Sequence, residues 1–354
     1  MTQTIDHPNP INLVLFGAGR WGSHLLRNFL DHPQVCLRAV VEASAARLKT
    51  LAQDLQAQGL DESVLLLSDW QAAIEIDGLD AVAIATPAAT HYTLIEAALK
   101  KGLHVLAEKP LTLDIASSQA LCNLAAEKNK QLVIDHTYLF HGAVTTAKTA
   151  LPSVGAPRYG YGTRTNFGPV RRDVDALWDL AIHDISIFNY WLGESPVQVR
   201  AQGSSWLQPN VSTPLSPNGL TDVVWCWLQY ASGFQATIHL CWANPDKQRR
   251  LCLVGDKATL IFDEMNSETP LVQKQGDLIE QDGWYTPANL ESHPLEVPPS
   301  EPLASVCNHF VTCVRENRSS PVSSGQVGTK LVSILVALSK SMNQDGVWVD
   351  VETL

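Results

Sequence analysis

The sequence predicts an α/β protein in two parts: an N-terminal Rossmann-type, doubly wound parallel sheet, then an α+β part with an open, mostly antiparallel sheet. Short apolar runs alternate strictly with helical patterns over the first part, and this alternation stops near residue 150. The length of 354 residues also exceeds what one hydrophobic core usually serves. We therefore expect domains at 1–135 and 136–354, with the C-terminal helix as a candidate to pack back on the first domain.

The first part contains short apolar runs typical of strands that are buried on both faces of a parallel sheet. Helical patterns separate these runs, and Gly59 and Gly102 follow two of the helices as stop signals. The expected strands lie near 11–16, 37–41, 64–67, 81–85, 104–107 and 132–134. The expected helices lie near 21–30, 45–58, 69–76, 91–101 and 114–129.

The second part begins with a helical pattern at 176–192 and continues with longer strand-like runs. These runs lie near 197–204, 222–230, 234–242, 250–254 and 258–262. A Ser232-Gly233 link joins two of them as a hairpin turn, so the sheet is expected to be mostly antiparallel. Segments 207–220 and 284–302 are predicted as surface loops, and two helices (303–316 and 325–343) and a short strand (347–351) close the chain.

Composition excludes several classes of function. A formal net charge of −11 argues against broad binding to nucleic acid or to anionic membranes. No stretch approaches the roughly 18 apolar residues of a membrane span, and the polar leader lacks a signal-peptide pattern, so a cytoplasmic location is expected. The seven cysteines include no Cys-x-x-Cys pair, which predicts reduced thiols and no metal site.

A glycine-rich turn joins the first expected strand to the first helix. It reads Gly17-Ala18-Gly19-Arg20-Trp21-Gly22. In this pattern Gly17 permits a tight turn, Gly19 lets a pyrophosphate approach the backbone, and Gly22 lets helix and strand pack closely. Because the helix N-terminus faces the phosphates, residues Gly17 to Gly22 are predicted to bind a dinucleotide. The alternative is a purely structural turn.

Glu42 lies at the end of the second expected strand, twenty residues beyond Gly22. A carboxylate in this place accepts hydrogen bonds from ribose hydroxyls and repels a 2′-phosphate. The cofactor is therefore predicted to be NAD, with NADP disfavoured.

Two further patterns contain residues suited to acid–base chemistry. Glu108-Lys109-Pro110 follows an expected strand at the sheet edge where ligands bind, so Lys109 could stabilise an alkoxide; a solvated lysine is the alternative. Asp179 and His183 are four residues apart on an expected helix, where a carboxylate can orient an imidazole base. For this pair the alternative is a surface salt bridge.

These motifs, in this order, resemble the glucose–fructose oxidoreductase/inositol dehydrogenase (Gfo/Idh/MocA) family over nearly the whole chain. The resemblance also includes Ala85-Thr86-Pro87 followed by His91. It implies a substrate cleft between the domains and a catalytic pair, Lys109 and His183, with His183 as general base. Asp179 would contact substrate or steady the histidine. Cofactor contacts would include Thr86, Pro87, His91, Glu108 and Lys109.

Within the family, the segments around Asp179–His183 and Trp242–Arg250 are similar to members that act on nucleotide-linked sugars, of the UDP-N-acetylhexosamine 3-dehydrogenase type. Ala181 and Ile182 depart from the common glycine and proline, which could narrow the cleft. Arg164 and Asn166 are candidate substrate-binding residues.

Several alternatives remain open for the activity and the assembly. They are a keto-sugar reductase, a dehydrogenase of free polyols or inositols, and a non-catalytic regulator that senses dinucleotide or sugar. The resemblance also implies a homodimer or homotetramer built through sheet faces.

Overall fold

The structure is a computed structural model that describes residues 10–60 and 62–353; the polar leader of the sequence lies mostly outside these residues. The chain forms two compact units. The first comprises the residues up to Thr137 together with Glu301–Thr329, and the second comprises Tyr138–Ser300 and the residues from Lys330 onward. A segment near the C-terminus thus belongs to the N-terminal unit.

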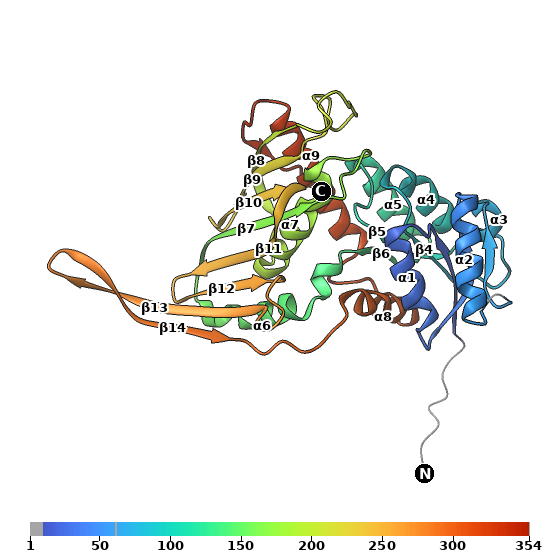
Figure 1. Ribbon diagram of the computed structural model, residues 1–354, viewed down its shortest axis with the longest axis horizontal. Coiled ribbons are helices and arrows are strands. Elements are labelled where there is room, and N and C mark those ends of the chain that lie inside the picture. Colours follow the sequence, from blue (N-terminus) through green and yellow to red (C-terminus); the bar gives the residue numbers. More distant parts are fainter. Residues whose placement is uncertain (1–9, 61, 354) are drawn as a thin grey trace, which may run out of the picture. The chain divides into compact units, whose positions relative to one another are not determined.

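The first unit is built on a six-stranded parallel sheet with strand order β3-β2-β1-β4-β5-β6 (Figure 1). This order confirms the predicted Rossmann sheet and places a topological switch point between β1 and β4, where such sheets bind ligands. The strands are β1 Ile11–Phe16, β2 Val35–Val41, β3 Leu65–Leu67, β4 Ala81–Ile84, β5 His104–Glu108 and β6 Leu132–Asp135.

Helices connect these strands, as the alternating sequence pattern predicts. They are α1 Arg20–Leu30, α2 Ala45–Ala57, α3 Trp70–Ile74, the 3₁₀ turn η1 Ala88–Thr90, α4 His91–Lys100 and α5 Ile115–Glu127. Side-chain caps begin several of them; the Asp114 carboxylate, for example, accepts a hydrogen bond from the Ser117 amide at the start of α5. A late helix, α8 Pro302–Arg315, packs against α1 and β6 in the same unit.

The second unit contains a nine-stranded sheet with strand order β14-β13-β12-β11-β7-β10-β9-β8-β15. Only the β7–β10 pair is parallel among the paired strands of this sheet in the described chain, which confirms the mostly antiparallel character. The strands are β7 Pro157–Phe167, β8 Pro196–Ser204, β9 Val223–Tyr230, β10 Gln235–Cys241, β11 Ala243–Gly255, β12 Ala258–Asp263, β13 Leu271–Gln281, β14 Trp284–Pro294 and β15 Val349–Asp350.

The helices of this unit differ in part from the prediction. They include α6 Gly142–Val154, the π-helical turn η3 Leu177–Ala181, α7 Ile182–Leu192 and most of α9 Gly325–Met342; the 3₁₀ turn η2 Thr137–Phe140 precedes α6. The predicted helix at 176–192 is therefore helical throughout, but its first turn is the wider π form. Such turns are frequent at functional sites.

Strand β7 was absent from the sequence prediction because glycines weaken a strand pattern. Gly160 and Gly162 occupy alternate positions of β7 on the face that meets helix α7. A Cβ added to Gly160 would come within 2.6 Å of the Phe188 ring and 2.9 Å of the Phe234 ring. The missing side chains let α7 approach the sheet closely, so the glycines serve packing rather than a turn.

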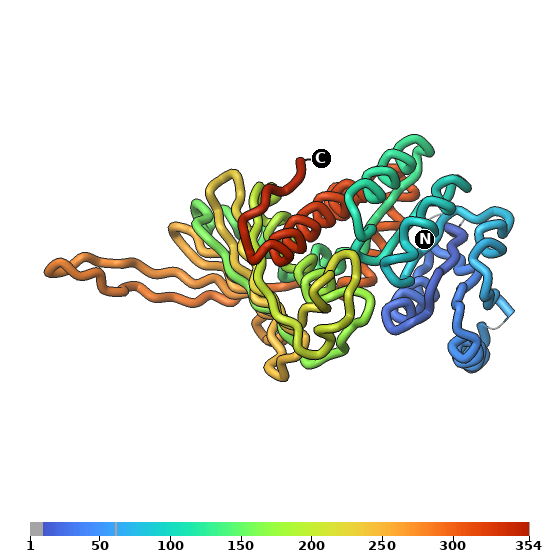
Figure 2. Tube along the Cα trace, turned by 90° about the horizontal axis from the view of Figure 1, so that it is seen from above, coloured from blue at the N-terminus to red at the C-terminus, as the bar shows by residue number. Residues whose placement is uncertain are grey.

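The predicted loop at 284–302 is wrong over its first part, because residues 284–294 form strand β14. Strands β13 and β14 make a long hairpin that extends beyond the other strands of their sheet (Figures 1 and 2). The polar, proline-containing composition of this segment reflects exposure of its side chains on both faces rather than a lack of regular structure. No helix in the described part of the chain has the length and apolar character needed to cross a membrane.

Candidate active site

A pocket of about 590 Å³ lies in the first unit at the carboxyl ends of the central strands. Five of the predicted cofactor residues line it together: Gly17, Gly19, Glu42, Thr86 and Pro87. The pocket therefore lies at the ligand-binding edge of the doubly wound sheet.

The glycine turn shapes this pocket for a diphosphate. Gly17 has a φ of +87°, and a Cβ there would lie 2.6 Å from the Ala85 carbonyl oxygen. An added Cβ at Gly19 would meet no atom within 4 Å, so the turn leaves open space in front of α1. Gly19 is the N-cap of α1 and supplies no side-chain cap, and the first turn carries no acidic residue. The amide groups at this helix N-terminus thus suit phosphate oxygens.

The Glu42 carboxylate is held in place at the pocket by two backbone amides. Its Oε2 accepts a hydrogen bond from the Ala18 amide at 3.0 Å, and its Oε1 accepts one from the Ser44 amide at 2.9 Å. Each oxygen retains acceptor capacity for a ribose hydroxyl. The nearby Arg47 guanidinium donates to the Ala18 carbonyl and to the Ser23 hydroxyl, so this cation braces the glycine turn.

Sequence reasoning missed part of the pocket wall. Several of the additional lining residues follow strand β3 or belong to the η1–α4 segment: Ser68, Trp70, Thr90, Thr93 and Leu94. Ser68 and Trp70 come directly after a strand end of the same sheet, and that position is the signal that could have found them. Arg20 and Trp21, by contrast, are exposed in the first turn of α1 and do not line this pocket.

His91 has a different place from the one predicted for a cofactor contact. Its side chain is fully buried, with Nδ1 2.8 Å from the Pro110 carbonyl oxygen and Nε2 3.0 Å from the Thr86 carbonyl oxygen. The imidazole therefore connects the loop after β4 with the loop that carries Lys109. In the structure His91 braces two loops of the site rather than lining the pocket.

Two buried carboxyl groups lie beside Lys109. Glu108 and Asp135 occupy paired register positions at the ends of β5 and β6 and are 8% and 1% exposed. Burial raises the pKa of Glu108, and the neighbouring Asp135 raises it further; burial also raises the pKa of Asp135. Because two buried carboxyls this close do not both ionise readily, a proton is favoured on one of them. Lys109, joined to Pro110 by a cis peptide bond, thus follows a pair of buried acids in which one proton is favoured.

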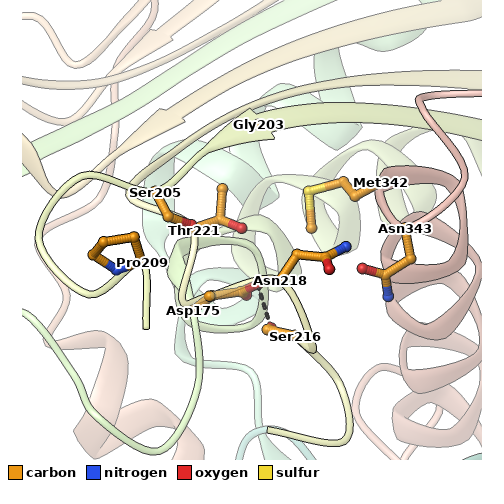
Figure 3. Close-up of a pocket in the computed structure, with 10 residues that line it drawn as sticks. Asp175, Gly203, Ser205, Pro209, Ser216, Asn218, Thr221, Met342 and Asn343 are labelled. Carbon is orange, nitrogen blue, oxygen red and sulfur yellow. Dashed lines mark hydrogen bonds between the residues drawn. The ribbon is translucent and has the colours of Figure 1, made fainter. Parts of the chain in front are cut away.

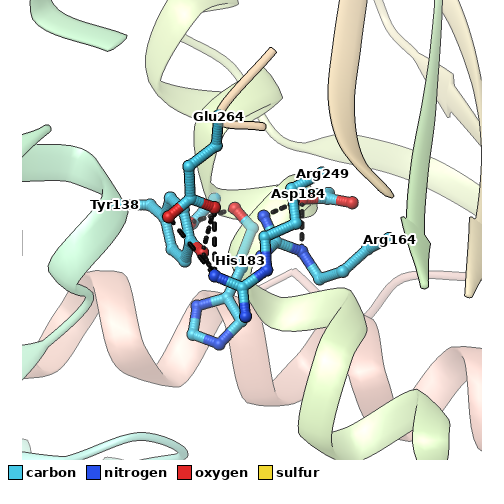
Figure 4. A network of polar contacts seen from close by, with 7 residues as sticks. Tyr138, Arg164, His183, Asp184, Arg249 and Glu264 are labelled. Atoms are coloured by element: carbon cyan, nitrogen blue, oxygen red, sulfur yellow. Dashed lines mark hydrogen bonds and ion pairs between the residues drawn. The ribbon is translucent and has the colours of Figure 1, made fainter. Parts of the chain in front are cut away.

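His183 lies in the first turn of α7, in the second unit. The edge of its ring packs against the Tyr138 ring, with centroids 5.0 Å apart and planes at 61° (Figure 4). The Arg164 guanidinium covers the same tyrosine ring at 4.3 Å. Tyr138 is thus held between a cation and the predicted catalytic imidazole, a contact that no sequence motif indicated.

An ion pair buried next to His183 anchors this arrangement. Arg164 is 2% exposed and Asp184 is fully buried. Arg164 Nε and Nη2 donate to Asp184 Oδ1 at 2.8 and 2.5 Å. Burial raises the pKa of Asp184, and the Arg164 cation opposes that shift. The predicted substrate contact at Arg164 is therefore not what its surroundings favour, because Asp184 and Tyr138 already use its guanidinium.

The Tyr138 hydroxyl takes part in a second set of polar contacts. It donates to Glu264 Oε2 at 2.8 Å and accepts from Arg249 Nη1 at 2.8 Å, while Arg249 also pairs with Glu264 at 3.1 Å (Figure 4). Burial acts to raise the pKa of Glu264, but the Arg249 cation and the Tyr138 hydrogen bond outweigh burial and lower this pKa below its ordinary value. The Tyr138 ring is consequently fixed at both its hydroxyl and its face.

The remaining predicted substrate residues have local partners. Asp179 Oδ1 accepts a hydrogen bond from Arg171 Nη1 at 3.2 Å, and Arg171 is also bound by Asp173. Asn166, near the end of β7, donates from Nδ2 to the Gly168 carbonyl oxygen at 2.9 Å. Asp179 is therefore a carboxylate whose charge is partly balanced by an arginine.

A second pocket, of about 210 Å³, lies in the second unit (Figure 3). The Asp175 carboxylate in its wall accepts hydrogen bonds from the Ser216 hydroxyl and the Trp178 amide. Asn218 and Asn343 also line the pocket. The protein's own donors thus satisfy the buried acid, and this pocket contains none of the predicted site residues.

Comparison with known proteins decides the family. Residues 11–136 match the model of the oxidoreductase family with an NAD-binding Rossmann fold, and residues 142–261 match the GFO/IDH/MocA C-terminal domain. The chain belongs to the Gfo/Idh/MocA family.

Similar proteins act on sugars and polyols. A UDP-N-acetylglucosamine 3-dehydrogenase of Acidithiobacillus ferrooxidans is 35% identical over 190 residues, which cover 53% of this chain and 56% of that enzyme. The match thus spans little more than half of that relative. A scyllo-inositol 2-dehydrogenase (NAD⁺) of Bacillus subtilis is 23% identical over 97% of both chains. A solved structure of the Acidithiobacillus ferrooxidans enzyme shares the fold, with a TM-score of 0.79, 23% identity and coverage of 95% and 99%.

Proposed function

We propose that this chain is an NAD-dependent dehydrogenase that transfers hydride between the nicotinamide and a secondary alcohol or ketone carbon of a sugar. The observation that carries the proposal is the first unit's pocket, where an uncapped helix N-terminus and the fixed Glu42 carboxylate lie together. This donor and acceptor set fits the diphosphate and ribose of a dinucleotide.

The chain's own residues would provide binding and proton transfer. The cofactor, when bound, supplies the hydride acceptor. The amides of the Gly17–Gly22 turn hold the diphosphate, and Glu42 accepts from the ribose hydroxyls. His183 takes the proton of the substrate hydroxyl, and Lys109 donates a hydrogen bond to the same oxygen as negative charge develops.

The substrate is proposed to be a nucleotide-linked sugar of the UDP-N-acetylhexosamine type, oxidised at a ring carbon. Similarity to the UDP-N-acetylglucosamine 3-dehydrogenase supports this choice. A free polyol or inositol is the second candidate, because similarity to the scyllo-inositol 2-dehydrogenase extends over nearly the full chain. The two candidates differ in whether turnover requires the nucleotide.

The test is to measure NADH formation when the purified protein with NAD receives UDP-sugars or free polyols. A 2-oxo acid is included as hydride acceptor in a parallel series, in case NADH does not leave the protein. Turnover with one UDP-sugar that drops by at least a thousandfold in His183→Ala, with NAD affinity retained, is the expected result.

His293→Ala is the matched control, since that exposed histidine lies on the β14 hairpin far along the chain from the site. Turnover of His183→Ala near that of the control would remove His183 from the mechanism. The alternative of a non-catalytic sensor would be favoured if the protein binds NAD tightly but neither oxidises any donor with NAD nor reduces any keto-sugar with NADH.

A further inference from the structure

Two neighbouring acids of the first unit, Glu108 and Asp135, each have one oxygen without a partner; we call these residues the acid pair. They occupy paired register positions at the ends of β5 and β6, so their side chains point to the same face of the parallel sheet. Glu108 Oε1 and Asp135 Oδ2 are buried and have no hydrogen-bond partner among the described residues. Because an unsatisfied buried acceptor costs free energy, a donor for these two oxygens is expected.

One proton between the two acids supplies that donor. The other oxygen of Glu108 accepts a hydrogen bond from the Lys109 amide at 3.3 Å. The other oxygen of Asp135 accepts one from the Thr137 hydroxyl at 2.7 Å. Burial, the charge of Asp135 and a hydrogen bond between the two carboxyls all raise the pKa of Glu108. A single proton therefore satisfies both remaining oxygens at once.

The donors around Asp135 favour the proton on Glu108. Burial raises the pKa of Asp135, but three hydrogen-bond donors act against this shift. They are the Thr137 hydroxyl, the Glu108 carboxyl and the Trp21 indole in the first turn of α1. Glu108 receives a backbone amide at the longer distance of 3.3 Å. Asp135 is thus favoured as the ionised member of the acid pair, with Glu108 donating to it.

His136, which directly follows Asp135, adds no charge to this group. Its Nδ1 lies 2.7 Å from Ser323 Oγ, and that hydroxyl donates its one proton to the Ile134 carbonyl oxygen at 2.6 Å. Nδ1 of His136 is therefore the donor to Ser323, and Nε2 carries no proton. Burial, and then the charge of Lys109, lowers the pKa of His136 to about 3. The imidazole is neutral near pH 7.

Cys307 and Lys109 are the other titratable groups that act on the acid pair in the described part of the chain. The Cys307 thiol on α8 is neutral, because burial and then the charge of Asp135 raise its pKa. The Lys109 ammonium acts against the effect of burial on the pKa of both acids. The group thus contains one cation and, with Glu108 protonated, one anion. A second ionised carboxyl would place unbalanced negative charge in a buried site.

We propose that Asp135 is a positioning residue for Lys109, with a carboxylate that accepts the proton-mediated hydrogen bond from Glu108 and attracts the Lys109 ammonium. The acid pair then holds the lysine twice, because Glu108 also accepts from its backbone amide. The inference rests on the proposed function, in which Lys109 donates a hydrogen bond to the substrate oxygen. Asp135 acts through Lys109 and not on the substrate itself.

The effect of this arrangement is expected in the hydride-transfer step rather than in cofactor binding. Lys109 stabilises negative charge on the substrate oxygen only when its ammonium is held at that oxygen. The acid pair lies at the ends of β5 and β6, whereas the diphosphate and ribose are assigned to the Gly17–Gly22 turn and Glu42. Loss of the Asp135 charge should therefore lower the rate and spare NAD affinity.

The test is a double-substitution cycle of Asp135→Asn and Lys109→Ala, measured as single-turnover hydride transfer with a donor that the wild-type chain oxidises. Asparagine keeps the size of the aspartate side chain and removes its charge. Asp135→Asn alone is expected to lower the rate by roughly 10–100-fold and to leave NAD affinity within about twofold. In the Lys109→Ala background the same substitution should have no further effect, because the group that it positions is absent.

Asp114→Asn is the matched control, since it makes the same chemical change at an exposed acid of the same unit, the N-cap of α5. It should leave the rate unchanged in both backgrounds. An Asp135→Asn effect of equal size with and without Lys109 overturns the inference, because a merely structural role predicts that result. Wild-type turnover of Lys109→Ala would instead contradict the proposed function of the lysine and overturn the inference with it.

Infrared spectroscopy of the purified chain tests the proton without any turnover. A protonated carboxyl and a carboxylate absorb at different frequencies. The difference spectrum between the wild-type chain and Glu108→Gln at pH 7 should therefore contain the band of a protonated carboxyl. The corresponding spectrum for Asp114→Asn should contain a carboxylate band. Lack of the protonated band in the Glu108→Gln spectrum overturns the proposed arrangement, even where Asp135→Asn fails to fold.

Discussion

Replacing Arg164 by methionine tests whether the buried ion pair beside His183 supports the second unit. Methionine keeps much of the length of the side chain and removes its charge. Asp184 is fully buried, its Oδ1 accepts both bonds from Arg164, and its Oδ2 has no hydrogen-bond partner among the described residues. The variant therefore leaves a buried carboxylate without its main counter-charge.

The magnitude follows from that burial. Removing one partner of a buried ion pair typically costs about 3–5 kcal/mol. For a unit of this size, 1 kcal/mol corresponds to about 2–4 °C in melting temperature, so we expect the transition of the second unit to fall by roughly 6–20 °C. The loss should shrink as pH falls, because Asp184, whose pKa burial already raises, then takes up a proton and becomes neutral.

Scanning calorimetry of three variants measures the effect: Arg164→Met, Asp184→Asn and the double substitution. The double variant removes both charges and should be more stable than Arg164→Met alone. The reasoning is refuted if Arg164→Met melts within about 3 °C of the wild-type chain, or if the double variant is no more stable than the single. Arg164→Met and the double variant should also lower turnover, because the Tyr138 ring that packs on His183 loses the Arg164 cation above it.

Two further predictions concern the first unit. Glu42→Ala should weaken NAD binding by about 10–100-fold, because charged hydrogen bonds of about 1.5–3 kcal/mol are lost. It should also reduce the preference for NAD over NADP. Titration calorimetry with both cofactors measures these changes, and an equal effect of the exposed control Glu127→Ala would contradict the prediction. Glu108→Gln should flatten the pH dependence of stability. Burial raises the pKa of Glu108 in the folded chain above its ordinary value of 4.5. Glu108 therefore contributes fully to the stability of the wild-type fold below pH 4.5, and this contribution is lost as the pH rises through the pKa of Glu108 in the folded chain. Melting curves from pH 4 to pH 9 test this, and parallel curves for both chains would exclude it.

The sequence by itself determined the Rossmann half and five of the residues that line the pocket of the first unit. Apolar runs of four to six residues and glycine at 17, 19 and 22 report local backbone geometry, and that geometry suffices to place the turn, the strand ends and Glu42 at one sheet edge. Only tertiary packing decided the partners of the polar residues. From the sequence, Arg164 is predicted to bind substrate in the cleft. In the structure, Gly160 and Gly162 allow α7 to lie close to β7, and this packing buries Arg164 against Asp184.

The β13–β14 hairpin and the C-terminal segment show the same limit. Residues 284–294 lack an alternating apolar pattern because neither face of β14 meets a core, so sequence periodicity could not distinguish this strand from a loop. Helix α8 was predicted, but its place against α1 and β6 depends on contacts between segments almost 300 residues apart. A sequence pattern indicates which side of a segment is buried. Which other segment covers that side is decided only when the whole chain folds.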